Sequence, residues 1–139
     1  MLIGEFQHNI DAKGRVFIPS RFREDLGERF ILCKGLDECL FVYSMDEWKN
    51  LEQKIRQLPL SRARNLQRFL FSGATDLEAD KQGRVVIPQQ LRKYAALESE
   101  AMIIGASIRA EVWALDRWEA TCSQITPDSV AEAMEELGF

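Results

Sequence analysis

Alternating polar and apolar residues open the chain and predict a half-buried β-strand at residues 5–10. A turn is expected next, because Asp11 can accept backbone hydrogen bonds and Gly14 can adopt a positive φ without steric cost. Residues 15–18 are mostly β-branched or aromatic, and Pro19 ends this second strand because it has no amide hydrogen to donate. The pattern therefore predicts a β-hairpin.

The same pattern returns in the second half of the chain. Asp-Ala-Lys-Gly-Arg-Val-Phe-Ile-Pro at residues 11–19 recurs as Asp-Lys-Gln-Gly-Arg-Val-Val-Ile-Pro at residues 80–88, and six of the nine positions are identical. Farther on, Trp48 recurs as Trp118. Each copy spans about forty-five residues, which is too few to bury a sufficient core alone. We therefore expect one module in two copies that share a core.

Helices and further strands are expected around the hairpins. The predicted elements of the first copy are a helix at 20–26 and strands at 30–34 and 39–43; those of the second are strands at 74–79, 84–87, 101–104 and 109–114 and a helical turn at 91–96. Apolar residues at helical spacing predict two linker helices, one at 44–58 that opens with a Ser44–Glu47 capping box and one at 61–71. A short acidic helix should begin at Thr126-Pro127.

These elements predict an α+β chain, mainly β, in four parts. The expected parts are a first hairpin repeat at 5–47, a helical linker at 48–75, a second hairpin repeat at 76–119 and an acidic C-terminal helix or tail at 120–139. The two tryptophans, Trp48 and Trp118, are expected to anchor the core or a subunit interface.

Charge is unevenly distributed along the 139 residues. The net charge is −4, but residues 98–139 hold nine acids and two bases, whereas residues 1–97 hold sixteen bases and thirteen acids. Because local patches decide whether a surface binds phosphate, the acidic balance does not exclude nucleic acid. The arginines at 62, 64 and 68 are expected to form the solvated face of a helix.

Other chemistry finds little support in the sequence. The three cysteines have no zinc-ligand spacing, and we expect them to be reduced and mostly buried, with no metal and no cofactor. His8 is the only histidine, and no phosphate-cradling loop or dinucleotide fingerprint is present, so an enzyme is not expected. No signal peptide or membrane-spanning run is evident, which predicts a cytoplasmic protein.

The paired Asp-x-x-Gly-Arg-Val-x-Ile-Pro hairpins resemble the AbrB-type swapped-hairpin β-barrel, and in particular the MraZ family of bacterial regulators. The resemblance covers nearly the whole chain, from Gly4-Glu5-Phe6 to Glu111-Val112-Trp113. It implies a duplicated swapped-hairpin barrel in a ring-shaped homo-oligomer. It also implies a sequence-specific DNA-binding regulator, associated with the nucleoid, that binds short direct repeats upstream of its own operon in the division and cell-wall gene cluster.

The resemblance places the family's D-x-x-x-R signatures at Asp11/Arg15 and Asp80/Arg84. An arginine just after a tight turn can contact phosphate or pair with guanine, whereas an aspartate repels phosphate. We therefore assign the turn structure to Asp11, Gly14, Asp80 and Gly83, and DNA contact to Lys13, Arg15, Arg21, Arg23 and Arg84. An Asp–Arg pair that only stabilises the hairpin is the alternative for each arginine.

The copies differ in charge. Gln82 and Gln90 stand in the second copy where Lys13 and Arg21 stand in the first. Because counterion release scales with the phosphates neutralised, the first copy is expected to be the main reading surface. The alternatives to a regulator are an antitoxin-like or scaffold module that binds another protein through the acidic segment 98–139, and a purely structural ring.

Overall fold

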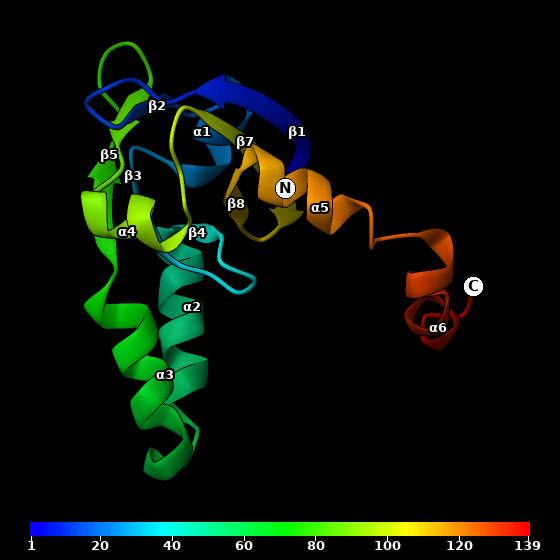
Figure 1. Ribbon diagram of the computed structural model, residues 1–139. Coiled ribbons are helices and arrows are strands. Elements are labelled where there is room, and N and C mark those ends of the chain that lie inside the picture. The colour runs from blue at the N-terminus through cyan, green and yellow to red at the C-terminus, as the bar shows by residue number, and fades with distance from the viewer.

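The computed structural model describes residues 1–139 (Figure 1). The strands are β1 (Leu2–Asn9), β2 (Arg15–Phe17), β3 (Arg29–Lys34), β4 (Leu40–Ser44), β5 (Thr75–Glu78), β6 (Arg84–Val86), β7 (Glu100–Ser107) and β8 (Ala110–Ala114). The helices are α1 (Ser20–Leu26), α2 (Met45–Arg56), α3 (Leu60–Ser72), α4 (Gln89–Tyr94), α5 (Leu115–Cys122) and α6 (Pro127–Glu136). The predicted α+β class is confirmed.

The strands form one large antiparallel sheet and one small one. The large sheet has the order β1-β7-β8-β4-β3-β5, and the small one pairs β2 with β6. When each strand is replaced by its counterpart in the other repeat, the order becomes β5-β3-β4-β8-β7-β1, which is the same order counted from the opposite end of the sheet. The two repeats are therefore related by an approximate two-fold axis. β1 pairs with β7 over eight residues and β5 pairs with β3, which means that each repeat supplies an outer strand to the other.

Two sequence predictions need correction here. The barrel is not closed, because β1 and β5 lie at opposite ends of the large sheet and do not pair with each other. The strands on either side of the first turn do not pair as a simple hairpin either: beyond the turn, β2 pairs with β6 of the other repeat. The partner of a strand depends on the whole chain, whereas alternation and turn residues report only on the strand itself.

Two hydrophobic clusters cover the two faces of the large sheet. Successive residues of β4 alternate between them, since Leu40 and Val42 belong to one cluster and Phe41 and Tyr43 to the other. The first cluster packs the sheet against α1, α4 and the β2–β6 pair, and the second packs it against α2, α3 and α5. The small sheet is therefore held on one face of the large sheet, opposite the helices that link the repeats.

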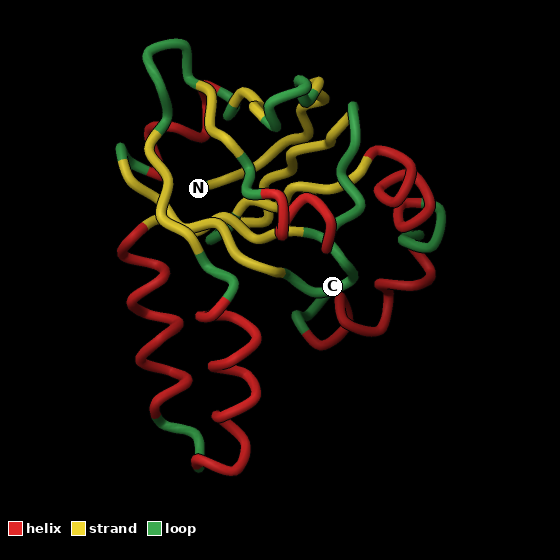
Figure 2. Tube along the Cα trace, turned by 60° about the vertical axis from the view of Figure 1, so that its left-hand side comes forward, coloured by secondary structure: helices red, strands yellow, loops and turns green.

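Helices α2 and α3 form a hairpin that projects from the strands, as Figures 1 and 2 show. Only half of the predicted capping box is present, because the Glu47 amide donates to Ser44 Oγ at 3.2 Å without the reciprocal bond. Helix α5 was not predicted; its N-cap is Ala114, which offers no capping side chain. At α6, Thr126 and Ser129 form the full reciprocal cap. No helix is long and apolar enough to cross a membrane.

The two predicted anchor tryptophans are partly buried and pack against the core on the helical side of the sheet. Trp48 packs against Tyr43 and Phe71, with ring centroids 5.9 Å and 5.0 Å apart, and Trp118 packs against Trp113 at 5.4 Å. Both indoles therefore fix a helix that follows β4 or β8 against the sheet.

Candidate nucleic-acid interface

The first Asp-x-x-Gly-Arg turn is organised by one carboxylate. Asp11 Oδ1 accepts hydrogen bonds from the amides of Lys13 and Arg15, both at 2.9 Å, and Asp11 Oδ2 accepts one from Arg15 Nε at 2.6 Å. Gly14 closes the turn at a φ of +80°, and its amide donates to the Asp11 carbonyl at 2.9 Å. The carboxylate therefore fixes both the turn and the base of the arginine side chain.

The second turn repeats this geometry almost bond for bond. Asp80 Oδ1 accepts from the amides of Gln82 and Arg84 at 2.9 and 2.8 Å, and its Oδ2 accepts from Arg84 Nε at 3.0 Å. In each turn the hydrogen bond from the backbone amide of the arginine is the main reason that the pKa of the aspartate lies below its ordinary value. The hydrogen bond from the arginine side chain lowers this pKa further. Each aspartate thus organises its own turn and holds the arginine that follows.

Strands β2 and β6 form a two-stranded antiparallel ribbon, the β2–β6 ribbon. Arg15 pairs with Val86 and Phe17 pairs with Arg84, so these four side chains share one face, while Val16 and Val85 are buried on the other. The two arginine side chains are 31% and 23% exposed. Their hydrogen bonds use only Nε, which leaves the Nη groups of both guanidinium ions available to another acceptor.

Each turn also carries an arginine from the other repeat. A β-carbon placed on Gly14 would lie 2.7 Å from Arg92 Cζ, and one placed on Gly83 would lie 2.7 Å from Arg23 Nη1. Arg92 Nε is held by the Ile87 carbonyl at 2.9 Å. The absence of a side chain at both glycines lets a guanidinium lie directly on the turn.

The structure thus groups the sequence-predicted residues differently. Lys13 and Arg15 lie at the first turn, but Arg23 lies at the second turn with Arg84. Arg21 is exposed on the first turn of α1 and has no side-chain partner. Sequence reasoning did not assign Arg92, although it occupies the same repeat position as Arg23 and that equivalence could have found it.

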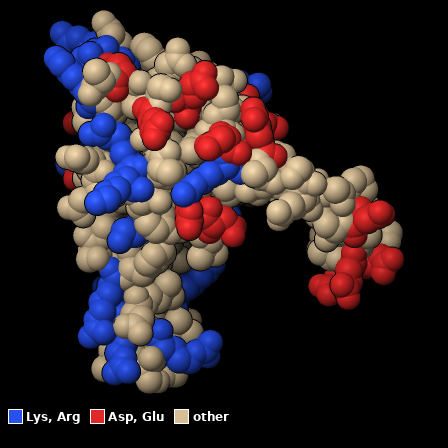
Figure 3. Space-filling model, in the orientation of Figure 1, with Lys and Arg blue, Asp and Glu red and all other residues tan.

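The two ends of the ribbon consequently carry equal charge. One turn has Lys13, Arg15 and Arg92; the other has exposed Lys81, together with Arg84 and Arg23. Figure 3 shows Lys and Arg side chains gathered over these turns, at the upper left. A two-stranded ribbon is one of the elements that a DNA major groove admits, and guanidinium ions suit both phosphate and guanine.

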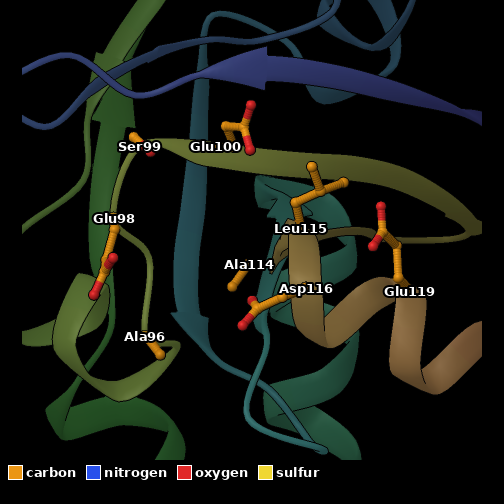
Figure 4. Close-up of a pocket in the computed structure, with 8 residues that line it drawn as sticks. All are labelled: Ala96, Glu98, Ser99, Glu100, Ala114, Leu115, Asp116 and Glu119. Carbon is orange, nitrogen blue, oxygen red and sulfur yellow. The ribbon is translucent and has the colours of Figure 1, made fainter.

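One hollow in the surface, away from the ribbon, has the opposite character. It measures about 370 Å³, and four carboxylates line it: Glu98, Glu100, Asp116 and Glu119. Figure 4 shows these side chains around the start of α5. Such a surface repels phosphate, and no cluster in the chain has the side chains to hold a metal ion. The β2–β6 ribbon, with basic side chains at both turns, is therefore the candidate interface with nucleic acid.

Comparison with known proteins agrees with the duplicated architecture. The family described as "MraZ protein, putative antitoxin-like" matches the chain twice, at residues 1–68 and 70–137. The proteins named transcriptional regulator MraZ from Alkaliphilus metalliredigens, Acetivibrio thermocellus and Caldicellulosiruptor bescii are 56%, 55% and 54% identical to it. Each of these alignments covers the full length of both proteins.

The two matched repeats and the full-length relatives define a transcriptional regulator built from two copies of one domain. The chain belongs to the MraZ family.

Proposed function

We propose that this chain is a sequence-specific DNA-binding regulator whose β2–β6 ribbon enters the major groove. The observation that carries the proposal is the shared exposed face of Arg15 and Arg84 on a rigid two-stranded ribbon, with a turn and a further arginine at each end. The buried face of the ribbon, with Val16 and Val85, fixes its position on the core. Both guanidinium ions are therefore presented without the entropic cost of ordering a loop.

The operator and assembly follow from the family resemblance. We propose that the protein binds short direct repeats upstream of its own operon in the division and cell-wall gene cluster, on the nucleoid in the cytoplasm. It would do so as a homo-oligomer arranged in a ring. One chain offers few phosphate contacts, and linked subunits on tandem boxes gain affinity through effective concentration. Binding to several boxes should therefore be much tighter than binding to one.

The proposal is tested by fluorescence anisotropy on DNA from upstream of the gene, against a shuffled duplex. Arg15→Ala and Arg84→Ala should each weaken specific binding by about 5- to 150-fold, the range of one base-reading arginine. Lys49→Ala is the matched control, since it removes an exposed cation on α2 across the sheet from the ribbon. Arginine variants that bind like the unmodified protein would overturn the site, and equal binding to the shuffled duplex would overturn the function.

A protein-interaction module is the second candidate, and one observation favours it. Every residue of α6 is exposed, as expected of a segment that wraps a partner protein. Limited proteolysis separates the two functions: a free binding tail should be cut readily near Thr126, and addition of its partner should protect it.

A further inference from the structure

Helix α6 stands apart from the rest of the chain with one apolar face. Val130, Met134 and Leu137 follow one another at helical spacing and are 41%, 39% and 74% exposed. An amphipathic helix normally buries such a face, and a helix of this length is marginal in water by itself. The apolar face of α6 therefore needs a covering surface that its own chain does not supply.

A matching apolar surface lies at the base of the α2–α3 hairpin. A groove of about 150 Å³ runs between the hairpin and the β3–β4 loop, lined among others by Leu51, Leu66 and Phe69. Leu36 at its edge is 67% exposed. The helix α3 that borders the groove has thirteen residues and α6 has ten, so their lengths, about 20 and 15 Å, allow α6 to lie alongside.

The charges of the two surfaces are complementary. Residues 53–72, which comprise the end of α2, the connecting turn and the whole of α3, hold five bases and no acid, while residues 118–139 hold five acids and no base. Lys34 lines the groove itself. Opposite charges around an apolar centre are typical of a protein interface, and they steer the two surfaces together.

In this structure α6 does not cover its own hairpin. Figure 1 shows α6 at the lower right, set apart from the hairpin, and every residue of α6 is exposed. The connection from α5 is short and ordered, because the amides of Gln124 and Ile125 continue the hydrogen bonding of α5 to Thr121 and Cys122 at 3.0 and 3.1 Å.

We infer that α6 of one copy docks its apolar face into the groove beside the α2–α3 hairpin of a second copy. The inference rests on the proposed homo-oligomer and specifies its interface. Because the two surfaces differ, the contact is head-to-tail, and repetition of one such contact generates a closed ring when its rotation closes. The β2–β6 ribbon takes no part in the contact and stays open to DNA.

Sedimentation velocity tests the interface with a matched pair of variants. Val130→Asp puts a charge into the apolar face and should reduce the assembly to a single chain of 16.0 kDa. Ala131→Asp adds the same charge outside that face and should leave the assembly intact. Unchanged circular dichroism and unchanged binding to one DNA box should accompany both, since α6 packs against nothing in its own chain.

Cross-linking identifies the neighbouring surface. In a Cys122→Ser background, one chain carries Leu66→Cys and a second, differently tagged chain carries Val130→Cys. A short bismaleimide should join the two chains, and Lys49→Cys in place of Leu66→Cys should give no product. The absence of any cross-linked product would overturn the inference. So would a chain carrying both Leu66→Cys and Val130→Cys that forms the cross-link only within itself.

The failure of the inference differs from the failure of the proposed assembly. An assembly that persists unchanged in Val130→Asp overturns only the α6 interface. An unmodified protein that sediments as a single chain at every concentration overturns the homo-oligomer and, with it, this inference. Binding to one DNA box is measured separately and does not depend on either outcome.

Discussion

Arg23 and Gly83 belong to different repeats, yet the guanidinium of Arg23 lies so close to Gly83 that a β-carbon on the glycine would meet Nη1 at 2.7 Å. Arg92 and Gly14 form the equivalent contact at the other turn. A methyl group at either glycine would displace the arginine from the turn. Each candidate DNA-binding turn therefore receives one of its arginines from the other repeat.

The contact between Arg23 and Gly83 predicts a specific energetic coupling. Gly83→Ala should be destabilising because its φ is +85° and because the methyl group displaces Arg23. In an Arg23→Ala background only the first cost remains, so the penalty on the free energy of unfolding should fall by about 0.5–1 kcal/mol. Urea denaturation of the four proteins measures this. The stability cost of Gly14→Ala, a glycine that faces Arg92, should simply add to the cost of Arg23→Ala. If the cost of Gly83→Ala also adds to that of Arg23→Ala, the contact between Arg23 and Gly83 is contradicted.

Equal charge at the two turns predicts equal salt dependence of DNA binding. Lys13→Ala and Lys81→Ala each remove one exposed cation, from opposite ends of the ribbon. Each should reduce the slope of log affinity against log salt by about 0.9, the value for one phosphate contact on duplex DNA. Anisotropy titrations at several salt concentrations measure the slopes. A loss confined to Lys13→Ala would instead support the sequence-based expectation of a dominant first repeat.

The lowered pKa of Asp11 and Asp80 predicts acid sensitivity of the turns. Since the folded-state pKa lies below the ordinary value of 3.8, the ionised carboxylates stabilise the fold above about pH 4. This stabilisation should be lost as the pH falls from about 4 through the folded-state pKa. Asp11→Asn should therefore be less stable than the unmodified protein at pH 7, and the difference should diminish as the pH falls through the folded-state pKa of Asp11. Urea midpoints measure it, and a difference that is independent of pH would contradict the prediction.

A buried carboxylate on β8 predicts a larger loss of stability. Glu111 accepts from Arg109 Nε at 3.0 Å and from Trp113 Nε1 at 3.0 Å, and Arg109 also lies over the ring of Phe41. Glu111→Ala leaves both donors without their partner, which should cost about 2 kcal/mol in the free energy of unfolding. Glu119→Ala, on the exposed surface of α5, is the control and should change it by less than about 0.5 kcal/mol.

The cysteines should differ in reactivity. Burial raises the pKa of the Cys33 and Cys39 thiols to about 12, whereas Cys122 is exposed. The folded protein should therefore react with a thiol reagent at Cys122 alone, and all three should react in denaturant. Mass spectrometry counts the modified sites. Labelling of Cys33 in the folded protein would indicate that the sheet opens.

Turns and helix faces were predictable from the sequence, because they depend on residues that are neighbours along the chain. Asp11 and Gly14 define a turn by themselves, and the solvated arginines of α3 follow from helical spacing; the structure agrees on both. Strand partners were not predictable, since β2 could pair with β1 or with β6 and has the same alternation in either case.

The same limit applied to the candidate site. Arg23 was expected to contact DNA with the other cations of the first repeat, but the two-fold arrangement carries it to the turn of the second repeat. The cysteines were expected to be mostly buried, and Cys33 and Cys39 are; which one stays exposed was not predicted, and it is Cys122, at the end of α5. In both cases the outcome depends on packing between segments that are distant along the chain.

The pairing of β1 with β7 has a consequence for synthesis in the cell. Leu2 pairs in register with Ser107, so β1, the first strand to be synthesised, has no partner until β7 has been made. A nascent chain that has left the ribosome only as far as the linker helices holds half of each sheet and no complete core. Folding must therefore follow translation rather than accompany it, and contacts so distant along the chain make it slow.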